Sequence, residues 1–157
     1  MLSIRLARLA DARPIAIMSR DLIERGLGWS WTPQRVARSV RDRDTNVIIG
    51  EQHGALVSFA LMQYLEEEAH LLLFAVLAHR RRGGVGRAMM LWLEKTALVA
   101  GIGTIHLEVR ARNASARAFY RRMGFEEREV VQGYYRGVEA AVRMRRVLWT
   151  TSGSRTV

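Results

Sequence analysis

A glycine-rich turn flanked by arginines is the first stretch whose residue types could do chemistry. It follows an apolar run at residues 71–77, precedes an amphipathic pattern at residues 85–99, and reads Arg81-Arg82-Gly83-Gly84-Val85-Gly86-Arg87-Ala88. Glycine lets the backbone approach a ligand closely, and the first N–H groups of a helix lack partners inside the helix. The stretch therefore predicts a site for a cofactor that carries a pyrophosphate, although such a turn can also precede a helix without binding anything.

Two known phosphate-binding patterns do not fit this turn. The phosphate loop of nucleotide hydrolases needs a lysine after its last glycine, but the single lysine, Lys95, lies deep in the predicted helix. The dinucleotide fingerprint needs a third glycine where this chain has Met89. The pattern that fits is Q/R-x-x-G-x-G/A, filled by Arg81, Gly84 and Gly86.

A glutamate and a tyrosine further along the chain are candidates for proton transfer. Alternation along the strand predicted at residues 104–109 places His106, Glu108 and Arg110 on one face. Apolar neighbours can raise the pKa of a glutamate, and a pKa near ~6–7 suits a general base at neutral pH. The alternatives are that Glu108 is a solvated or arginine-paired carboxylate and that Tyr120 is a helix tyrosine that only packs.

Together these motifs resemble the GCN5-related N-acetyltransferases, the GNAT superfamily. The glycine-rich turn matches their acetyl-CoA loop, and a second signature, N-x-x-A/S-x-x-x-Y-x-x-x-G-F, is filled by Asn113, Ala116, Tyr120, Gly124 and Phe125. The run Leu-Glu-Val-Arg at residues 107–110 and the ending at residues 134–144 are similar to the RimI-type branch, which acetylates the N-terminal amine of a ribosomal protein. The resemblance covers residues 69–148 and implies an α/β GNAT fold, a mixed central sheet with helices on both faces.

The resemblance also implies a role for each site residue. Acetyl-CoA would be the co-substrate, its pyrophosphate held by backbone N–H groups of Arg82, Gly83, Gly84, Val85, Gly86, Arg87 and Ala88. Main-chain bonds from Phe74, Ala75 and Val76 would hold the pantetheine arm, and Asn113 would contact that arm. Glu108 would remove a proton from the amine and Tyr120 would give one to the departing thiolate, with direct transfer and no acyl-enzyme.

The resemblance leaves the acceptor open. RimI-type enzymes tend to carry glutamate and asparagine on the central strand where this chain has His70 and Leu73. An α-amine has a pKa of ~8 and a lysine amine ~10.4, so freeing the lysine amine costs about 3 kcal/mol more. This favours a protein or peptide N-terminus; the alternatives are a small-molecule amine acetyltransferase and a non-catalytic module that binds acetyl-CoA or RNA.

Composition favours a globular protein without a metal. The chain has 157 residues, 49% hydrophobic and 25% charged, and no cysteine, which excludes disulfides, thiolate metal sites and an acyl-cysteine intermediate. Without a run of about 18 apolar residues or a signal-peptide pattern, we expect a cytoplasmic protein with no membrane contact, as a monomer or homodimer. The net charge is +10, and the arginines are spread along the chain rather than gathered in one block. This favours a genome rich in arginine codons as the explanation of the charge, over binding to the ribosome or to nucleic acid.

The predicted elements follow the order β-α-α-β-β-β-α-β-α-β-β. Strands are expected at residues 3–6, 46–52, 55–65, 69–77, 104–109, 126–131 and 140–148. Helices are expected at residues 12–25, capped by Asp11, and at 33–43, 85–99 and 114–123. The apolar strand at 69–77 is expected to be buried on both faces and to pair in parallel with the strand at 104–109. We expect one domain at residues 1–149 and a disordered tail at 150–157.

Overall fold

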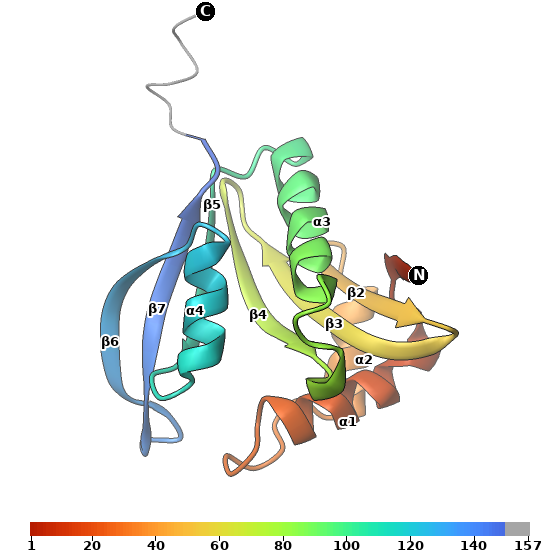
Figure 1. The fold of residues 1–157 in the computed structure, drawn as a ribbon, viewed down its shortest axis with the longest axis horizontal. Helices are drawn as coiled ribbons and strands as arrows, with labels where there is room; N and C mark the ends of the chain where they lie inside the picture. The colour runs from red at the N-terminus through yellow and green to blue at the C-terminus, as the bar shows by residue number, and fades with distance from the viewer. Residues whose placement is uncertain (150–157) are drawn as a thin grey trace, which may run out of the picture. The chain divides into compact units, whose positions relative to one another are not determined.

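The strands and helices follow the order that the sequence predicts (Figure 1). The computed structural model describes residues 1–149, and the predicted tail at 150–157 lies outside them. The elements are β1 (Leu2–Leu6), α1 (Ala12–Leu22), α2 (Pro33–Arg41), β2 (Thr45–Gln52), β3 (Ala55–Tyr64), β4 (Glu68–Val76), α3 (Val85–Val99), β5 (Thr104–Arg110), α4 (Ala114–Arg122), β6 (Glu126–Tyr135) and β7 (Glu139–Val147). Two short 3-10 helices, η1 (Leu9–Asp11) and η2 (Ala78–Arg80), follow β1 and β4. Within residues 1–149, no helix is both long and apolar enough to cross a membrane.

The strands form one mixed sheet in the order β1-β2-β3-β4-β5-β7-β6. β4 and β5 pair in parallel from Glu68↔Thr104 to Leu71↔Leu107, and α3 lies between them in the chain. The pairs β1–β2, β2–β3, β5–β7 and β6–β7 are antiparallel. The predicted mixed α/β sheet and its parallel pair are therefore confirmed.

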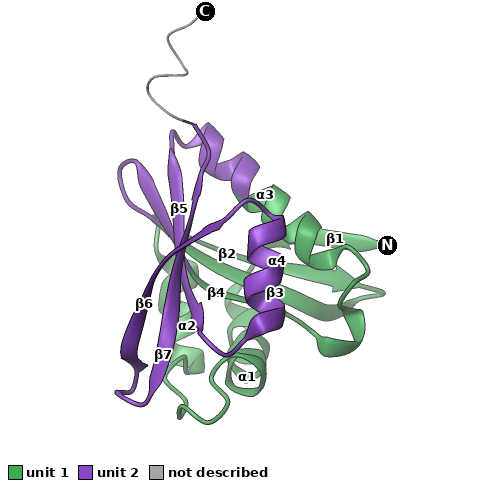
Figure 2. Cartoon of the chain, turned by 60° about the vertical axis from the view of Figure 1, so that its left-hand side comes forward, with its two compact units in different colours: residues 1–63, 72–93 green, residues 64–71, 94–157 purple. Residues whose placement is uncertain are grey.

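The chain divides into two compact units, drawn in different colours in Figure 2. Unit 1 comprises Met1–Gln63 and Leu72–Leu93, and unit 2 comprises Tyr64–Leu71 and the described part of Glu94–Val157. Each unit joins two separate stretches of the chain, so each depends on packing between residues that are not consecutive in the sequence. That residues 1–149 form a single domain stays a prediction.

Unit 1 has helices on both faces of its strands. One face packs against α1 and α2 through a buried apolar cluster that includes Ile15, Ala16, Val36, Val47, Ile49, Phe59, Leu61, Leu73 and Ala75. On the other face α3 approaches β2 at Gly50, where an added Cβ would lie 3.2 Å from the Met89 sulfur. The absence of a side chain at Gly50 therefore lets α3 lie close to the sheet.

The start of α1 differs from the prediction. Asp11 does not cap the helix with its side chain; its carboxylate instead lies 2.8 Å from an Arg5 guanidinium nitrogen and accepts the Arg8 N–H at 2.7 Å. The helix begins after the short 3-10 turn η1 and ends at Leu22, three residues before the predicted end. An ion pair to β1 has displaced the local cap, because the guanidinium is a stronger partner than a helix N–H.

Two strands also differ from the prediction. β4 alternates buried and half-buried residues, so it is not buried on both faces as its apolar sequence suggested. β6 runs to Tyr135, four residues beyond the predicted end, with irregularities in its pairing to β7 between Glu127 and Glu129 and between Val131 and Tyr135. Pairing with β7 extends this strand beyond the point where its own sequence stops alternating.

Candidate active site

Glu108 lies on the polar side of β5. Ile105, Leu107 and Val109 are buried, whereas the residues that alternate with them are half-buried, so the predicted common face of His106, Glu108 and Arg110 is confirmed. The Glu108 side chain is 12% exposed. Its carboxylate is therefore enclosed, but it stands outside the apolar core.

Three side chains of unit 2 surround the Glu108 carboxylate. His70 Nε2 lies 2.6 Å from Oε1, the Tyr134 hydroxyl donates to the same oxygen at 3.2 Å, and Arg143 Nε lies 3.5 Å from Oε2. The sheet register brings them together, because Arg143 pairs with Glu108 and His70 pairs with His106, two residues before Glu108. We call these four residues, His70, Glu108, Tyr134 and Arg143, the Glu108 cluster.

The Glu108 cluster shifts the pKa of Glu108 in the direction opposite to the one expected from the sequence. Burial raises the pKa, but the hydrogen bonds from His70 and the Tyr134 hydroxyl, together with the Arg143 charge, hold it below its usual value. The expectation of a raised pKa was wrong because the neighbours are two hydrogen-bond donors and an arginine rather than apolar groups. Glu108 is therefore ionised at neutral pH and has a reduced affinity for a proton.

Tyr120 is buried in α4. It is 8% exposed, and its ring contacts Phe119 and Phe125 edge to face, with centroids 5.5 and 5.6 Å away. Burial, with a smaller contribution from Tyr135, raises the pKa of the Tyr120 hydroxyl. The hydroxyl therefore keeps its proton at neutral pH and can act as a donor. Both the acid role and the purely packing role fit this geometry, so the acid role stays a prediction.

Asn113 begins the helix that carries Tyr120. Its Oδ1 accepts the Ala116 N–H at 3.1 Å, which is the N-cap bond of α4. The spacing of asparagine and alanine in the second signature thus has a structural function. The predicted contact of Asn113 with the cofactor arm would have to use its amide Nδ2.

The glycine-rich turn connects η2 to α3 in unit 1. Arg82 and Gly84 have positive φ angles of 67° and 86°, and the Gly84 carbonyl accepts the Ala88 N–H at 3.0 Å, which closes the first turn of α3. The N–H groups at residues 85–87 precede this bond and stand at the start of the helix, where an anion is stabilised. The Ala88 N–H is used inside the helix, so Ala88 does not belong among the predicted pyrophosphate donors.

Arg81 ties the turn to the end of β4. Its Nε donates to the Val76 carbonyl at 3.1 Å. The neighbouring Ala75 carbonyl accepts the Ser58 hydroxyl of β3 at 2.8 Å. These bonds fix the backbone of the segment Phe74, Ala75 and Val76, in which the sequence predicts the contacts to pantetheine. The contacts themselves stay a prediction.

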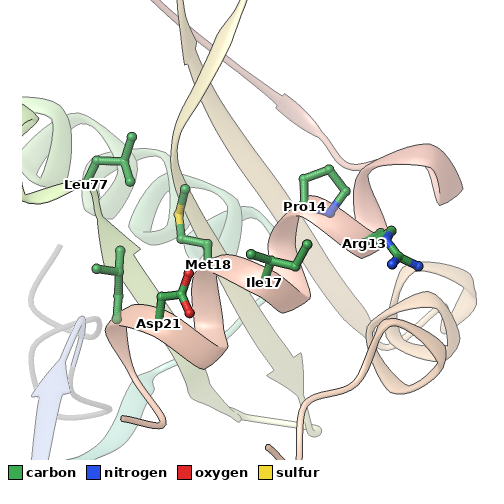
Figure 3. A pocket seen from close by; sticks show the side chains of 7 residues that line it. Arg13, Pro14, Ile17, Met18, Asp21 and Leu77 are labelled. Atoms are coloured by element: carbon green, nitrogen blue, oxygen red, sulfur yellow. The ribbon is translucent and has the colours of Figure 1, made fainter.

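An apolar hollow lies against α1 in unit 1 (Figure 3). Its volume is about 510 Å³, and it is lined by Arg13, Pro14, Ile17, Met18, Asp21, Leu22 and Leu77. No sequence signal pointed to it, because six of these residues lie in α1 and the seventh, Leu77, comes to them only through packing. Its lining could accommodate an apolar group.

Glu24 organises the segment between α1 and α2, which the sequence did not indicate. It is 7% exposed and accepts the Ser19 hydroxyl at 2.9 Å, the Ser30 N–H and hydroxyl at 2.7 Å each, and the Trp31 N–H at 3.2 Å. A buried carboxylate that receives this many hydrogen bonds fixes the loop around it. No motif at these positions would have revealed the arrangement.

The mixed α/β sheet and the glycine-rich turn at the start of α3 are the features that the sequence predicts for an acyltransferase. Comparison with known proteins identifies the family. The model of the acetyltransferase (GNAT) family matches residues 16–125. The chain therefore belongs to the GNAT family, whose members are acetyl-CoA-dependent N-acetyltransferases.

Among individual proteins of known name, the chain is similar to N-acetyltransferases that are named for acting on protein N-termini or on ribosomal protein S18. The chain is 34% identical over 112 residues, 71% of its own length and 75% of the relative's, to the ribosomal protein bS18-alanine N-acetyltransferase of Escherichia coli strain K12. It is 25% identical over 154 residues, 90% of each chain, to an N-alpha-acetyltransferase of Sulfurisphaera tokodaii. The crystal structure of the ribosomal-protein-S18-alanine N-acetyltransferase from Escherichia coli matches with a TM-score of 0.82, at 28% identity and over 96% of both chains.

Proposed function

We propose that the protein transfers the acetyl group of acetyl-CoA to the N-terminal α-amine of a protein or peptide. The observation that carries the proposal is the 34% identity to an enzyme named for acetylating an alanine of ribosomal protein bS18. The lower basicity of an α-amine relative to a lysine amine also supports it, because less energy is needed to free the nucleophile. A ribosomal-protein acceptor would place the enzyme in the cytoplasm. As a separate part of the proposal, the enzyme acts as a monomer or homodimer.

In this proposal acetyl-CoA binds along the start of α3 and the end of β4. Backbone N–H groups of the turn hold its pyrophosphate, from Arg82, Gly83, Gly84, Val85, Gly86 and Arg87. The main chain of Phe74, Ala75 and Val76 holds the pantetheine arm. Asn113 adds a contact through its Nδ2 amide, since its Oδ1 caps α4.

The chemical step is direct attack of the amine nitrogen on the thioester carbonyl. The C–N bond forms, the C–S bond breaks, a proton leaves the nitrogen and a proton reaches the sulfur. The sequence predicts Glu108 as the base, and Tyr120 supplies the proton for the departing thiolate. The Tyr120 hydroxyl is protonated at neutral pH, as the acid role requires, and its burial, which raises the pKa, makes it a weaker acid than a solvated tyrosine.

Two peptides test the acceptor at fixed salt. One has a free N-terminus and no lysine, and the other has a blocked N-terminus and one lysine. Transfer to the first peptide alone is the expected result, and transfer to the second alone would overturn the proposed acceptor. Silence from both, with acetyl-CoA still bound, would favour a small amine or a non-catalytic role. Binding to RNA would be recognised by its steep weakening as salt rises.

A further inference from the structure

The Glu108 carboxylate is poorly placed to receive a proton from a substrate. Oε1 already faces His70 at 2.6 Å and Tyr134 at 3.2 Å, and Oε2 faces Arg143 at 3.5 Å. A proton arriving on either oxygen would have to compete with these donors and with the positive charge of Arg143. The side chain is also only 12% exposed. An incoming amine would therefore meet the neighbours of Glu108 before it met the carboxylate.

His70 is more exposed than Glu108 and has a ring nitrogen that can accept a proton. Its side chain is 31% exposed, more than twice the exposure of Glu108. Because an ionised carboxylate can only accept, the 2.6 Å bond requires the hydrogen on His70 Nε2. In the neutral ring the lone pair then lies on Nδ1, which can accept a proton. A carboxylate that fixes the tautomer of a histidine base is the arrangement known from hydrolase triads.

We propose that His70 Nδ1 is the atom that takes the proton from the acceptor amine, and that Glu108 holds the ring in the tautomer needed for this. The proposal rests on the acetyl transfer proposed above and refines its base. As the C–N bond forms, the nitrogen loses a proton to Nδ1 and the ring becomes an imidazolium, stabilised by the Glu108 carboxylate. The thiolate takes its proton from Tyr120; the imidazolium later releases its proton to water, and Tyr120 regains one.

A second histidine–glutamate pair on the same strands provides an internal control. His106 is the register partner of His70, and its Nε2 lies 3.3 Å from Glu68 Oε1. Glu68 is 56% exposed, so this carboxylate is solvated rather than enclosed among donors. The two pairs share residue types and strands but differ in the burial of the carboxylate. His106 is therefore the matched control for His70.

The experiment compares turnover of the full chain and its variants on whichever of the two peptides the wild type acetylates. His70→Gln retains an N–H donor for Glu108 but cannot take a proton, and we expect its kcat to fall by about 10²-fold or more. We expect the KM for acetyl-CoA to stay near wild type, and His106→Gln to keep wild-type turnover. His70→Gly should be as slow as His70→Gln and should regain turnover when imidazole is added.

Each outcome bears on the proposal. Recovery of His70→Gly with imidazole supports a proton-accepting ring, because a purely structural role would not respond to a free base. Near-normal turnover of His70→Gln would overturn the proposal, as would a folded, acetyl-CoA-binding His70→Gly that ignores imidazole. Equal losses in His70→Gln and His106→Gln would also overturn it. A wild-type enzyme silent on both peptides would instead overturn the proposed acceptor, and the assignment of His70 with it.

Discussion

Replacing Tyr120 by phenylalanine removes one hydroxyl from α4 and leaves the aromatic ring in place. The edge-to-face contacts with Phe119 and Phe125 depend on the ring, so Tyr120→Phe should retain them. The stability cost is then the loss of one buried hydroxyl and its interactions, about 1 kcal/mol in the free energy of unfolding. The variant should therefore be folded at the temperature of the assay.

The expected loss of turnover is much larger than this stability cost. The Tyr120 hydroxyl carries its proton at neutral pH, and burial raises its pKa further, so the proton is in place when the thiolate departs. Removing a positioned general acid lowers turnover by about 10²–10⁴-fold. This corresponds to roughly 3–5 kcal/mol of activation free energy. The raised pKa also means that Tyr120 should cause no loss of turnover up to the ordinary tyrosine pKa of ~10.

The absence of cysteine makes the assay simple. A thiol-reactive dye detects released CoA without a background from the protein, which has no thiol of its own. Tyr64→Phe at the end of β3 removes the same hydroxyl elsewhere in unit 2 and is expected to keep its turnover. Near-normal kcat in Tyr120→Phe would refute the acid role, and so would an equal loss in Tyr64→Phe. A change confined to the KM for the acceptor would point to a binding role instead.

Three predictions concern stability. Gly124 has a φ of 94°, and an added Cβ would displace the Arg146 guanidinium from its hydrogen bond to the Met123 carbonyl, so Gly124→Ala should cost about 2–3 kcal/mol in chemical denaturation. Gly101→Ala, with a φ of 81° and open space around it, should cost only about 1 kcal/mol; equal costs would show that the overlap is relieved. Glu24→Ala should cost about 2–4 kcal/mol because it leaves several donors without their acceptor, and wild-type stability would contradict this account. The largest cause of the lowered pKa of Asp11 is the hydrogen bond from the Arg5 guanidinium. The wild type should therefore have a higher free energy of unfolding than Asp11→Asn, with the whole difference present above about pH 4. It should disappear as the pH falls through the lowered pKa, and a difference in unfolding midpoint that ignores pH would refute the linkage.

Local signals were sufficient for several elements of the fold. The helix at residues 85–99 has the predicted bounds, because its apolar spacing and the preceding glycines are local signals that do not depend on distant residues. The hairpin turn at His53 and Gly54 has φ angles of 53° and 76°, which suit the residues placed there. The Thr32 hydroxyl caps α2 by accepting the Arg35 N–H at 3.3 Å. Each of these features depends on residues that are close together in the sequence.

Features that depend on distant partners could not be predicted. Asp11 is a good local cap, yet Arg5 of β1 takes its carboxylate. Alternation along β5 correctly placed Glu108 on the polar face, but its partners His70 and Tyr134 stand 38 and 26 residues away in the sequence. Only the register of the sheet brings them to the carboxylate. The direction of the pKa shift of Glu108 follows from those partners, which is why the prediction from sequence alone had the opposite direction.

The family motif identifies Glu108, but the chemistry of Glu108 depends on which residue stands at position 70. RimI-type enzymes tend to carry a glutamate there, and a second carboxylate so close to Glu108 would raise its pKa by like-charge repulsion. His70 does the reverse, because it donates to Oε1 at 2.6 Å and helps to hold the pKa below its usual value. The same glutamate is thus a better proton acceptor in the first setting and a better orienting group in the second. The histidine that departs from the family pattern and the glutamate that keeps to it are therefore one coupled feature, and replacing either should alter the function of the other.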